Sequence, residues 1–469
     1  MIPHSCRAMT ALALLLVLAA SGCAHYPVNT PLATFQQDSG YRFVQDAVPP
    51  NTNSLFVCLV FSGGGTRAAA FAYGIMEKLR DTKIVWQGVT KSLLDEVDCI
   101  SSVSGGSFTA AYYGLFGEQI FSDFRTHFLE RNVQGELLGK ALAPSNWLRL
   151  ASPNFSRIDL AAELYDEVLF KGKTFNDLTD RKKRPYVMIN STNLANGDGF
   201  QFTQDQFDFI GSDLATYPVS RAVAASSAFP FLLGPLSLKN YQNPDNYRVP
   251  TDARLGVEDF YDNRRRYQWA RNRVAYLDKD ARPYVHLMDG GLADNIGLRS
   301  LGDAFLRTSG FIRRLINEGE IDRLVFIVVN ARTDDQDGLS RSESPPGLGT
   351  VAFKTATVAL DNYSFETIEF MRDNATARKQ TQKVIAACQK MLEKCSAQRV
   401  QQLAKTIDPY VIEVNFEAIP DPERRNYFLG LPTSFSLSRD QVKDLVEIGP
   451  QLLDQSPDFK ALLESLSGH

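Results

Sequence analysis

The segment 55–80 constrains the fold of this 469-residue chain more than any other segment. Residues 55–61 (LFVCLVF) form a continuous apolar run, residues 62–65 form a glycine-rich turn, and residues 66–80 carry apolar side chains at helical spacing. A strand that is apolar on both faces is typical of a parallel sheet covered by helices on both sides. The segment therefore predicts an α/β fold.

Later segments repeat the alternation of strands and helices. A helix is expected at 107–116 and others within 350–405 and 437–465, and strands are expected at 98–103, 186–190, 284–288, 324–330 and 410–416. Alternating elements of this kind predict a three-layer α/β/α sandwich with a mostly parallel central sheet and a helical C-terminal extension.

The N-terminus has the features of an export signal. Arg7 precedes the apolar run 11–20, which is too short to cross a bilayer but fits the core of a secretory signal. The residues Ala20-Ser21-Gly22-Cys23 that follow resemble the lipobox of bacterial lipoproteins, with Ala20 where such boxes usually carry Leu. This resemblance implies removal of residues 1–22 and lipidation of Cys23, with 23–50 as a tether. The alternative is an ordinary cleaved signal.

Charge and cysteine content narrow the class of protein. Lys and Arg number 50 against 54 Asp and Glu, so a broad basic face for nucleic acid is not expected. Cys58 and Cys99 lie in apolar runs and are expected to be buried and inert. Cys388 and Cys395 lie on one helical stripe, which favours burial, although an oxidising compartment leaves a bridge between them open.

The glycine turn Ser62-Gly63-Gly64-Gly65 can bind an anion. Its N–H groups lie at the start of a helix, whose dipole favours negative charge. The anion could be a reaction oxyanion or a dinucleotide pyrophosphate, since Gly63, Gly65 and Ala68 match the loose dinucleotide fingerprint. No strand ending in an acid follows about 20 residues later, which disfavours the dinucleotide.

A second turn, Ser102-Val103-Ser104-Gly105-Gly106, lies between the strand at 98–103 and the helix at 107–116. This is the context of a nucleophile elbow, in which a sharp turn exposes a hydroxyl above the sheet. Ser104 is the predicted nucleophile, and the N–H of Gly105 could help to hold the oxyanion. The alternative is a plain loop.

The base expected to activate Ser104 is Asp289, in the motif Asp289-Gly290-Gly291. Of the five histidines, His4 falls in the signal, His25 in the tether and His469 at the chain end. Structural roles are expected for the other two, His127 and His286, because His286 should face away from Asp289 on an extended strand. A Ser-Asp dyad needs no histidine.

These motifs, in this order, resemble the patatin-like phospholipase family over residues 55–330. The family pattern is a glycine-rich oxyanion segment, a G-x-S-x-G elbow and a D-G-G/A acid; residues 224–231 (AASSAFPF) and 292–295 (LADN) also look like family blocks. The resemblance implies that Ser104 is the nucleophile and Asp289 the base. It further implies that Gly63, Gly64, Gly65 and Arg67 form or support the oxyanion site. This chain departs from the pattern at Ser62, Ala68 and Ser102.

A catalytic domain is expected at 51–335, and residues 336–469 are expected to form a mostly helical region packed on it. The expected activity is a serine acyl hydrolase of the phospholipase A or lysophospholipase type, acting on phospholipid or another lipid ester without metal or cofactor. Alternatives are an acyltransferase using the same dyad, a non-catalytic lipid-binding lipoprotein and a dinucleotide enzyme. The expected location is the bacterial cell envelope, with Cys23 in the outer membrane and the protein facing the periplasm.

One further segment, 241–273, combines aromatic residues with the cluster Arg264-Arg265-Arg266. It could contact lipid headgroups or form a solvated surface loop. The solvated loop is the preferred interpretation.

Overall fold

A computed structural model describes residues 29–44, 47–152, 155–230, 232–307, 310–334, 343–392 and 407–467. Cys23 and Cys395 lie outside these residues, so lipidation and a bridge to Cys395 stay predictions. No helix within the described ranges is both long and apolar enough to cross a membrane.

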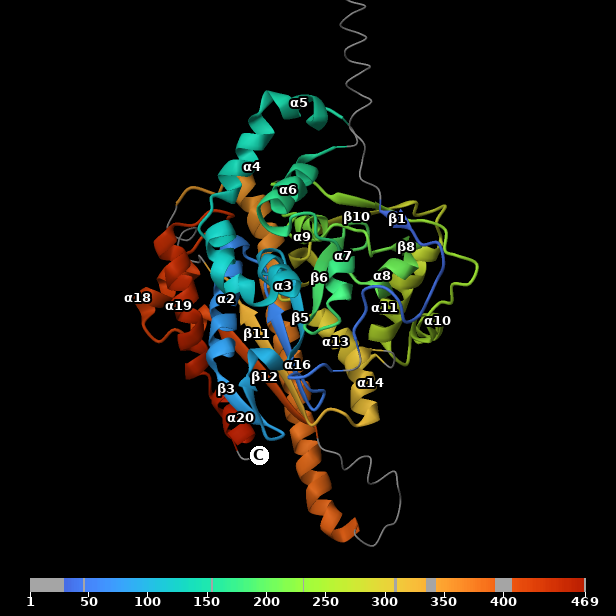
Figure 1. Cartoon of the computed structure of the whole chain (residues 1–469), viewed down its shortest axis with the longest axis vertical. Helices are drawn as coiled ribbons and strands as arrows, with labels where there is room; N and C mark the ends of the chain where they lie inside the picture. The colour runs from blue at the N-terminus through green and yellow to red at the C-terminus, as the bar shows by residue number, and fades with distance from the viewer. Residues whose placement is uncertain are drawn as a thin grey trace, which may run out of the picture.

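An eight-stranded sheet forms the centre of the molecule (Figure 1). Its order is β12-β11-β2-β5-β6-β10-β9, with β7 paired to β6. The bounds are β2 Leu55–Phe61, β5 Val97–Val103, β6 Tyr186–Asn193, β7 Gly199–Gln201, β9 Leu236–Lys239, β10 Tyr284–Asp289, β11 Arg323–Asn330 and β12 Asp408–Asn415. The strands from β12 to β6 run parallel, and β7, β9 and β10 are antiparallel to their neighbours.

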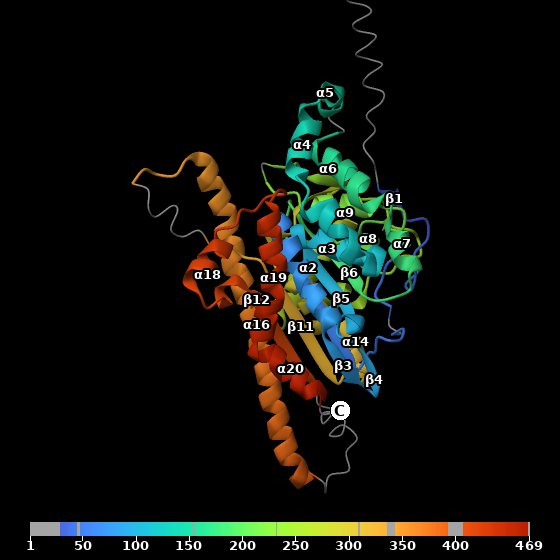
Figure 2. The ribbon, with the colours of Figure 1, turned by 60° about the vertical axis from the view of Figure 1, so that its left-hand side comes forward.

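Helices cover both faces of the sheet, as the sequence predicts (Figure 2). Helix α2 packs against α3 and α19. Helix α13 packs against α14, α16 and β5, and α16 packs against β12. The larger helices are α2 Gly65–Asp81, α3 Gly105–Phe116, α4 Val133–Leu142, α6 Arg157–Tyr165, α9 Val219–Ser226, α11 Arg264–Val274, α13 Leu298–Leu306, α14 Phe311–Glu318, α16 Leu348–Leu392, α18 Pro422–Leu429, α19 Arg439–Gln455 and α20 Pro457–Ser467.

Shorter elements complete the chain. They are the strand pairs β1 Thr30–Pro31 with β8 Ser212–Asp213 and β3 Lys83–Trp86 with β4 Val89–Ser92, the helices α5 Pro144–Leu150, α7 Phe175–Asp180, α8 Gln204–Phe209, α10 Thr251–Gly256 and α12 Gly291–Asp294, the π-helices η3 Ile120–Leu129 and η4 Asp166–Phe170, and the 3₁₀ turns η1 Leu94–Glu96, η2 Gly117–Gln119, η5 Ala275–Leu277 and η6 Phe416–Ala418. The three-layer α/β/α sandwich and its helical C-terminal part are confirmed.

The C-terminal region is continuous with the rest of the fold. Strand β12 extends the central sheet by pairing in parallel with β11 along its whole length. Helix α19 packs against α2 so closely that a Cβ on Gly74 would lie 2.3 Å from the carbonyl oxygen of Val446. The sheet therefore crosses the expected domain boundary at 335.

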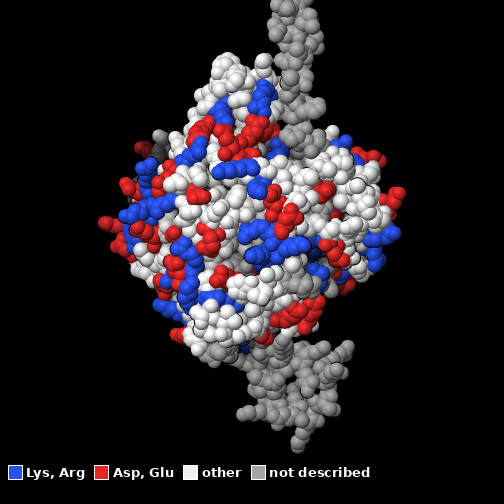
Figure 3. Space-filling view, viewed as in Figure 1, with Lys and Arg blue, Asp and Glu red and all other residues white. Residues whose placement is uncertain are grey.

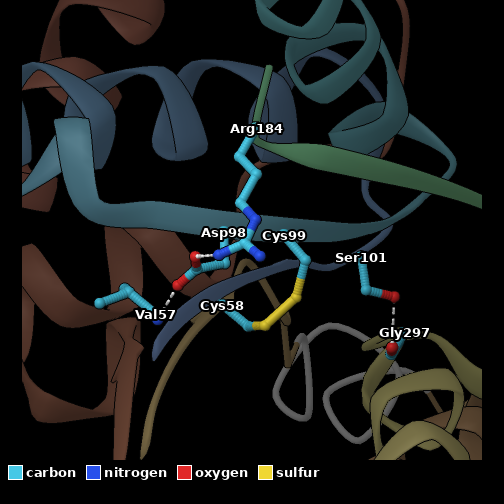
Figure 4. Close-up of a disulfide and its surroundings, with 7 residues drawn as sticks. All are labelled: Val57, Cys58, Asp98, Cys99, Ser101, Arg184 and Gly297. Atoms are coloured by element: carbon cyan, nitrogen blue, oxygen red, sulfur yellow. Dashed lines mark hydrogen bonds and ion pairs between the residues drawn. A yellow bond between two sulfur atoms is a disulfide. The ribbon is translucent and has the colours of Figure 1, made fainter. Parts of the chain in front are cut away.

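The prediction for Cys58 and Cys99 is half wrong. Both are buried in strands, as expected, but they form a disulfide (Figure 4). Strands β2 and β5 are parallel neighbours with these two residues in register, which brings their Cα atoms to 4.7 Å. The sequence shows that each run is apolar but not which strands pair, so the bond was missed.

A buried ion pair lies beside this disulfide (Figure 4). Arg184 Nη1 is 2.5 Å from Asp98 Oδ1, and the N–H of Val57 donates to Asp98 Oδ2 at 2.6 Å. These contacts hold the amino-terminal ends of β2 and β5 together. The opposite, carboxyl ends carry the candidate site.

Candidate active site

Ser104 lies in the turn between β5 and α3, where the sequence places the elbow. Its backbone has φ 50° and ψ −120°, a conformation that residues with side chains rarely adopt. The Ser104 N–H donates to the hydroxyl of Ser226 at 2.9 Å, and this hydroxyl donates to the carbonyl of Asn190 at 2.6 Å. The strained turn is therefore fixed by groups from α9 and β6.

The two glycines after Ser104 allow the turn to close against its neighbour. A Cβ on Gly105 would lie 2.0 Å from the carbonyl oxygen of Gly65, and one on Gly106 would lie 2.7 Å from the Cβ of Phe61. Neither contact leaves room for a side chain. The elbow and the glycine turn at 63–65 thus lie directly against each other.

Ser102 occupies the position at which the family pattern has glycine. Its hydroxyl donates to the carbonyl of Met188 at 3.1 Å and accepts from the Ser107 hydroxyl at 3.1 Å. The side chain is buried with hydrogen-bond partners, so β5 accommodates it beside the turn at Ser104.

The hydroxyl of Ser104 donates to Asp289 Oδ2 at 2.8 Å. Asp289 ends β10, and its other carboxylate oxygen accepts from the N–H of Gly291 at 2.8 Å. Gly290 between them is required by space, because a Cβ there would lie 2.3 Å from the carbonyl oxygen of Asn190. The hydrogen bond therefore joins two residues that are 185 positions apart in the sequence, next to the carboxyl end of β5.

Burial raises the pKa of Asp289 to about 7, and the hydrogen bonds from Gly291 and Ser104 oppose that shift. Asp289 is 3% exposed, so the charged form of its carboxyl group has lost most of its hydration. A carboxylate with a pKa near neutrality holds a proton much better than an ordinary aspartate. Asp289 can therefore accept the proton of Ser104 and return it near pH 7.

The glycine turn brings backbone donors next to Ser104. Gly64 and Gly65 have φ of 140° and 62°, and a Cβ on Gly63 would lie 3.3 Å from the Cβ of Ser104. The N–H of Gly63 donates to the carbonyl of Asn295 at 2.9 Å. Within the described ranges, no protein acceptor is recorded for the N–H groups of Gly64, Gly65 and Gly105. These three remain as candidate donors to an oxyanion, and Gly63 supports the turn.

Arg67 does not point a free guanidinium at Ser104. Its Nε donates to the carbonyl of Ala331 at 2.9 Å, Nη1 donates to Leu431 O at 2.7 Å, and Nη2 donates to Thr433 Oγ1 at 3.0 Å. The N–H of Thr66 also donates to the carbonyl of Ser434 at 2.9 Å. Arg67 therefore supports the glycine turn by fixing the C-terminal segment against it.

Neither His127 nor His286, the two histidines that the structure describes, is hydrogen-bonded to Ser104 or Asp289. His286 is exposed on β10 and its Nδ1 is 2.7 Å from the Ser237 hydroxyl. His127 lies in η3. Among the described residues, the titratable side chain that accepts a hydrogen bond from the Ser104 hydroxyl is Asp289.

The sequence did not assign roles to Ser226 and Asn295. Both lie in segments that look like family blocks, but nothing in the sequence shows that Ser226 fixes the Ser104 N–H or that Asn295 binds Gly63. The Asn295 side chain also lies close to both motifs, since a Cβ on Gly63 would be 2.3 Å and one on Gly291 2.9 Å from its Oδ1. Asn295 therefore joins the acid loop to the glycine turn.

Residues 59–301 match the family described as patatin-like phospholipase. No curated protein sequence matches the chain. A structure of human GIVD cytosolic phospholipase A2 is 14% identical over 59% of this chain and 45% of its own, with a TM-score of 0.37. The same human protein in complex with methyl gamma-linolenyl fluorophosphonate is 12% identical over 89% and 59%, with a TM-score of 0.41. VipD from Legionella pneumophila is 13% identical over 90% and 70%, with a TM-score of 0.27. This chain thus spans about half the length of the human protein.

Proposed function

Because the chain belongs to the patatin-like phospholipase family, we propose that it is a serine acyl hydrolase that cleaves phospholipid or related lipid esters with a Ser104–Asp289 dyad. The observation that carries this proposal is the 2.8 Å hydrogen bond from the Ser104 hydroxyl to the buried carboxylate of Asp289. The family supports the lipid substrate, and the hydrogen bond supports the assignment of roles.

Acylation begins when Ser104 Oγ attacks the ester carbonyl carbon and Asp289 Oδ2 accepts the hydroxyl proton. The carbonyl oxygen becomes an oxyanion, which the N–H groups of Gly64, Gly65 and Gly105 stabilise at the starts of α2 and α3. The intermediate then collapses, the bond to the alcohol oxygen breaks, and Asp289 gives its proton to the leaving alcohol. Ser104 now carries the acyl group.

Deacylation repeats these steps with water. Asp289 accepts a proton from a water molecule whose oxygen attacks the acyl carbonyl carbon. The same N–H groups stabilise the second oxyanion. Collapse breaks the bond to Ser104 Oγ, which recovers its proton from Asp289, and the fatty acid leaves. The pKa of about 7 suits Asp289 to both directions of proton transfer.

Turnover by the purified protein tests this function. The wild type should release fatty acid from mixed phospholipid micelles, and Ser104→Ala should lower the rate by at least about 10³-fold. Ser122→Ala changes an exposed serine on η3 and should match the wild type. A wild type without turnover on any lipid or soluble ester would favour the non-catalytic lipoprotein.

We also propose that Cys23 anchors the mature protein to the outer membrane, facing the periplasm. The short apolar run and the small residues before Cys23 support this, and the Cys58–Cys99 disulfide suits an oxidising compartment. Cells given a labelled fatty acid should incorporate it into the wild type and not into Cys23→Ala. Equal incorporation into both would contradict the anchor.

A further inference from the structure

Helices α4 and α5 form a projection at one end of the molecule, which we call the α4–α5 arm (residues 133–150; Figures 1 and 2). Four large apolar side chains on it are mostly exposed: Leu138 61%, Leu142 62%, Trp147 59% and Leu148 67%. Figure 3 shows uncharged atoms at the upper tip of the molecule, with charged atoms beneath them. Large apolar side chains gathered on one projection usually mark a contact surface.

The pattern of these residues predicts one continuous apolar surface. Leu138 and Leu142 are four residues apart on α4 and therefore share a face of that helix. Trp147 and Leu148 follow on α5, after a bend at Ala143 and Pro144. The indole N–H of Trp147 donates to the carbonyl of Leu142 at 3.1 Å, which holds α5 against the end of α4.

The cations of the arm favour an anionic partner. Within the arm the sequence has two cations, Lys140 and Arg149, and one acid, Glu136, which pairs with Arg131 at 2.6 Å. Lys140 pairs with Glu167 at 2.9 Å, and Arg149 pairs with Glu163. These pairs are solvent-exposed and therefore weak. An anionic surface can compete for both cations.

Hydrogen bonds link the base of the arm to the glycine turn of the candidate site. At its base, the Gln134 N–H donates to the carbonyl of Phe435 at 3.2 Å. The preceding residue, Ser434, accepts from the N–H of Thr66 in the glycine turn. The base of the arm is therefore two hydrogen-bonded contacts away from the N-terminus of α2. A surface bound by the arm would lie at the same end of the sheet as Ser104.

We propose that the α4–α5 arm docks on an anionic phospholipid surface, with its four apolar side chains among the lipids and its cations at the phosphates. Exposed leucines and a tryptophan beside Lys and Arg are the composition of an interfacial helix. The proposal rests on the proposed lipid hydrolase function for its purpose, because docking would present the site to its substrate. Binding itself requires no turnover.

The segment 241–273 is a weaker candidate for this role. Arg266 lies 2.8 Å from Asp259 and 3.5 Å from Asp252, and Arg265 lies over the ring of Phe370. Both arginines thus contact other residues of the protein, and no group of mostly exposed apolar side chains like that of the arm accompanies them within this described segment.

Co-sedimentation with vesicles tests the docking surface. A variant with Leu138→Ser, Leu142→Ser, Trp147→Ser and Leu148→Ser should bind phosphatidylglycerol vesicles at least about tenfold more weakly than its parent. The matched control carries Val85→Ser, Val89→Ser, Tyr261→Ser and Phe365→Ser, which change four exposed apolar residues elsewhere. All proteins carry Ser104→Ala and the same N-terminus, so neither turnover nor the N-terminal apolar run contributes to the difference.

Tryptophan fluorescence reports on the arm itself. The chain has three tryptophans; Trp86 is 4% exposed and Trp269 packs against the core, whereas Trp147 is exposed. Phosphatidylglycerol vesicles should shift the emission to shorter wavelength, and phosphatidylcholine vesicles should do so much less. Trp147→Phe should lose the shift but still sediment. Binding by the four-serine variant equal to that of the control, with no shift from Trp147, would overturn the proposal.

Two further measurements separate this proposal from its alternatives. With Ser104 restored, the four-serine variant should hydrolyse a soluble short-chain ester like the wild type and vesicle lipid more slowly. If neither protein hydrolyses either substrate but vesicle binding still depends on the arm, the hydrolase proposal is wrong and the docking surface stands.

Ultracentrifugation tests the other occupant. If the wild type forms a dimer that the four-serine variant cannot form, and neither binds vesicles, the arm contacts a second copy of the chain and the proposal of lipid docking is wrong.

Discussion

Gly105 lies against the backbone of Gly65, so close that a Cβ on Gly105 would be 2.0 Å from the Gly65 carbonyl oxygen. This contact joins the nucleophile turn to the glycine turn. The starts of α2 and α3 meet there, with N–H groups of both helices beside Ser104. The geometry of the site therefore requires a glycine at position 105 as well as the contact between Ser104 and Asp289.

Gly105→Ala should damage both stability and turnover. The added methyl group must displace backbone atoms of Gly65, which we expect to lower the free energy of unfolding by about 1–3 kcal/mol and kcat by about 10²-fold or more. The control is Gly302→Ala on α13, where a Cβ would meet nothing within 4 Å. That variant should be about 0.5–1 kcal/mol more stable than the wild type. Denaturant unfolding and a soluble-ester assay measure both effects; equal behaviour of the two variants would contradict the contact.

The activity of the protein should depend on the protonation of Asp289. Only the carboxylate form can accept the Ser104 proton, and burial raises its pKa to about 7. We therefore expect kcat/KM to rise with pH through about 7 and then level off. Above about pH 7, where the wild type has the carboxylate, Asp289→Asn should lower kcat by at least about 10³-fold. A pH profile that is flat from about 5.5 to 8.5 would be inconsistent with Asp289 as the base.

Asp289 should also affect stability, with a definite sign. Because its pKa is raised on folding, the folded protein holds the proton more tightly than the unfolded chain. This contribution is fully present below the ordinary aspartate value of 3.8 and is lost as pH rises through about 7. The wild type loses this contribution between pH 5 and pH 8, whereas Asp289→Asn has no such group to lose it. The free energy of unfolding of Asp289→Asn minus that of the wild type should therefore be about 2–3 kcal/mol larger at pH 8 than at pH 5, at about 1.4 kcal/mol for each pKa unit. Urea unfolding of both proteins at the two pH values measures this difference. A difference that is smaller at pH 8 than at pH 5 would contradict a raised pKa of Asp289.

The disulfide offers a separate test of the fold. Cys58 and Cys99 are 41 residues apart, and removing a bond that closes such a loop should cost about 2–4 kcal/mol. Cys58→Ala with Cys99→Ala should therefore unfold at lower denaturant, and reductant should lower the stability of the wild type but not of this variant. Peptide mapping of unreduced protein should recover the two cysteines linked. Free thiols at both positions in protein isolated without reductant would contradict the bond.

The sequence predicted the elements with local signals. The apolar run 55–61, the helix after it and the two glycine motifs all lie where expected, because each depends on neighbouring residues. Contacts between residues far apart in the sequence could not be predicted from these local patterns. The register of β2 with β5 joins Cys58 to Cys99, and the packing of residues 431–434 against Arg67 brings the C-terminal region to the site.

The exposure of the α4–α5 arm could not be predicted from the sequence either. Leu138 and Leu142 have the spacing of a buried helical face, and only the tertiary fold shows that they are exposed. The sequence suggested Ser104 and Asp289 as partners through their motifs, the shortage of usable histidines and the family resemblance, but it could not show their contact. Their contact is set by the order of β5, β6 and β10 in the sheet.

The central claim is that Ser104 is the nucleophile, and covalent labelling tests it most directly. A fluorophosphonate probe should react with the wild type, and peptide mass spectrometry should place the adduct on Ser104. Ser104→Ala should not react, although it should remain folded by circular dichroism. Equal labelling of the wild type and Ser104→Ala, or an adduct on another residue, would contradict the account.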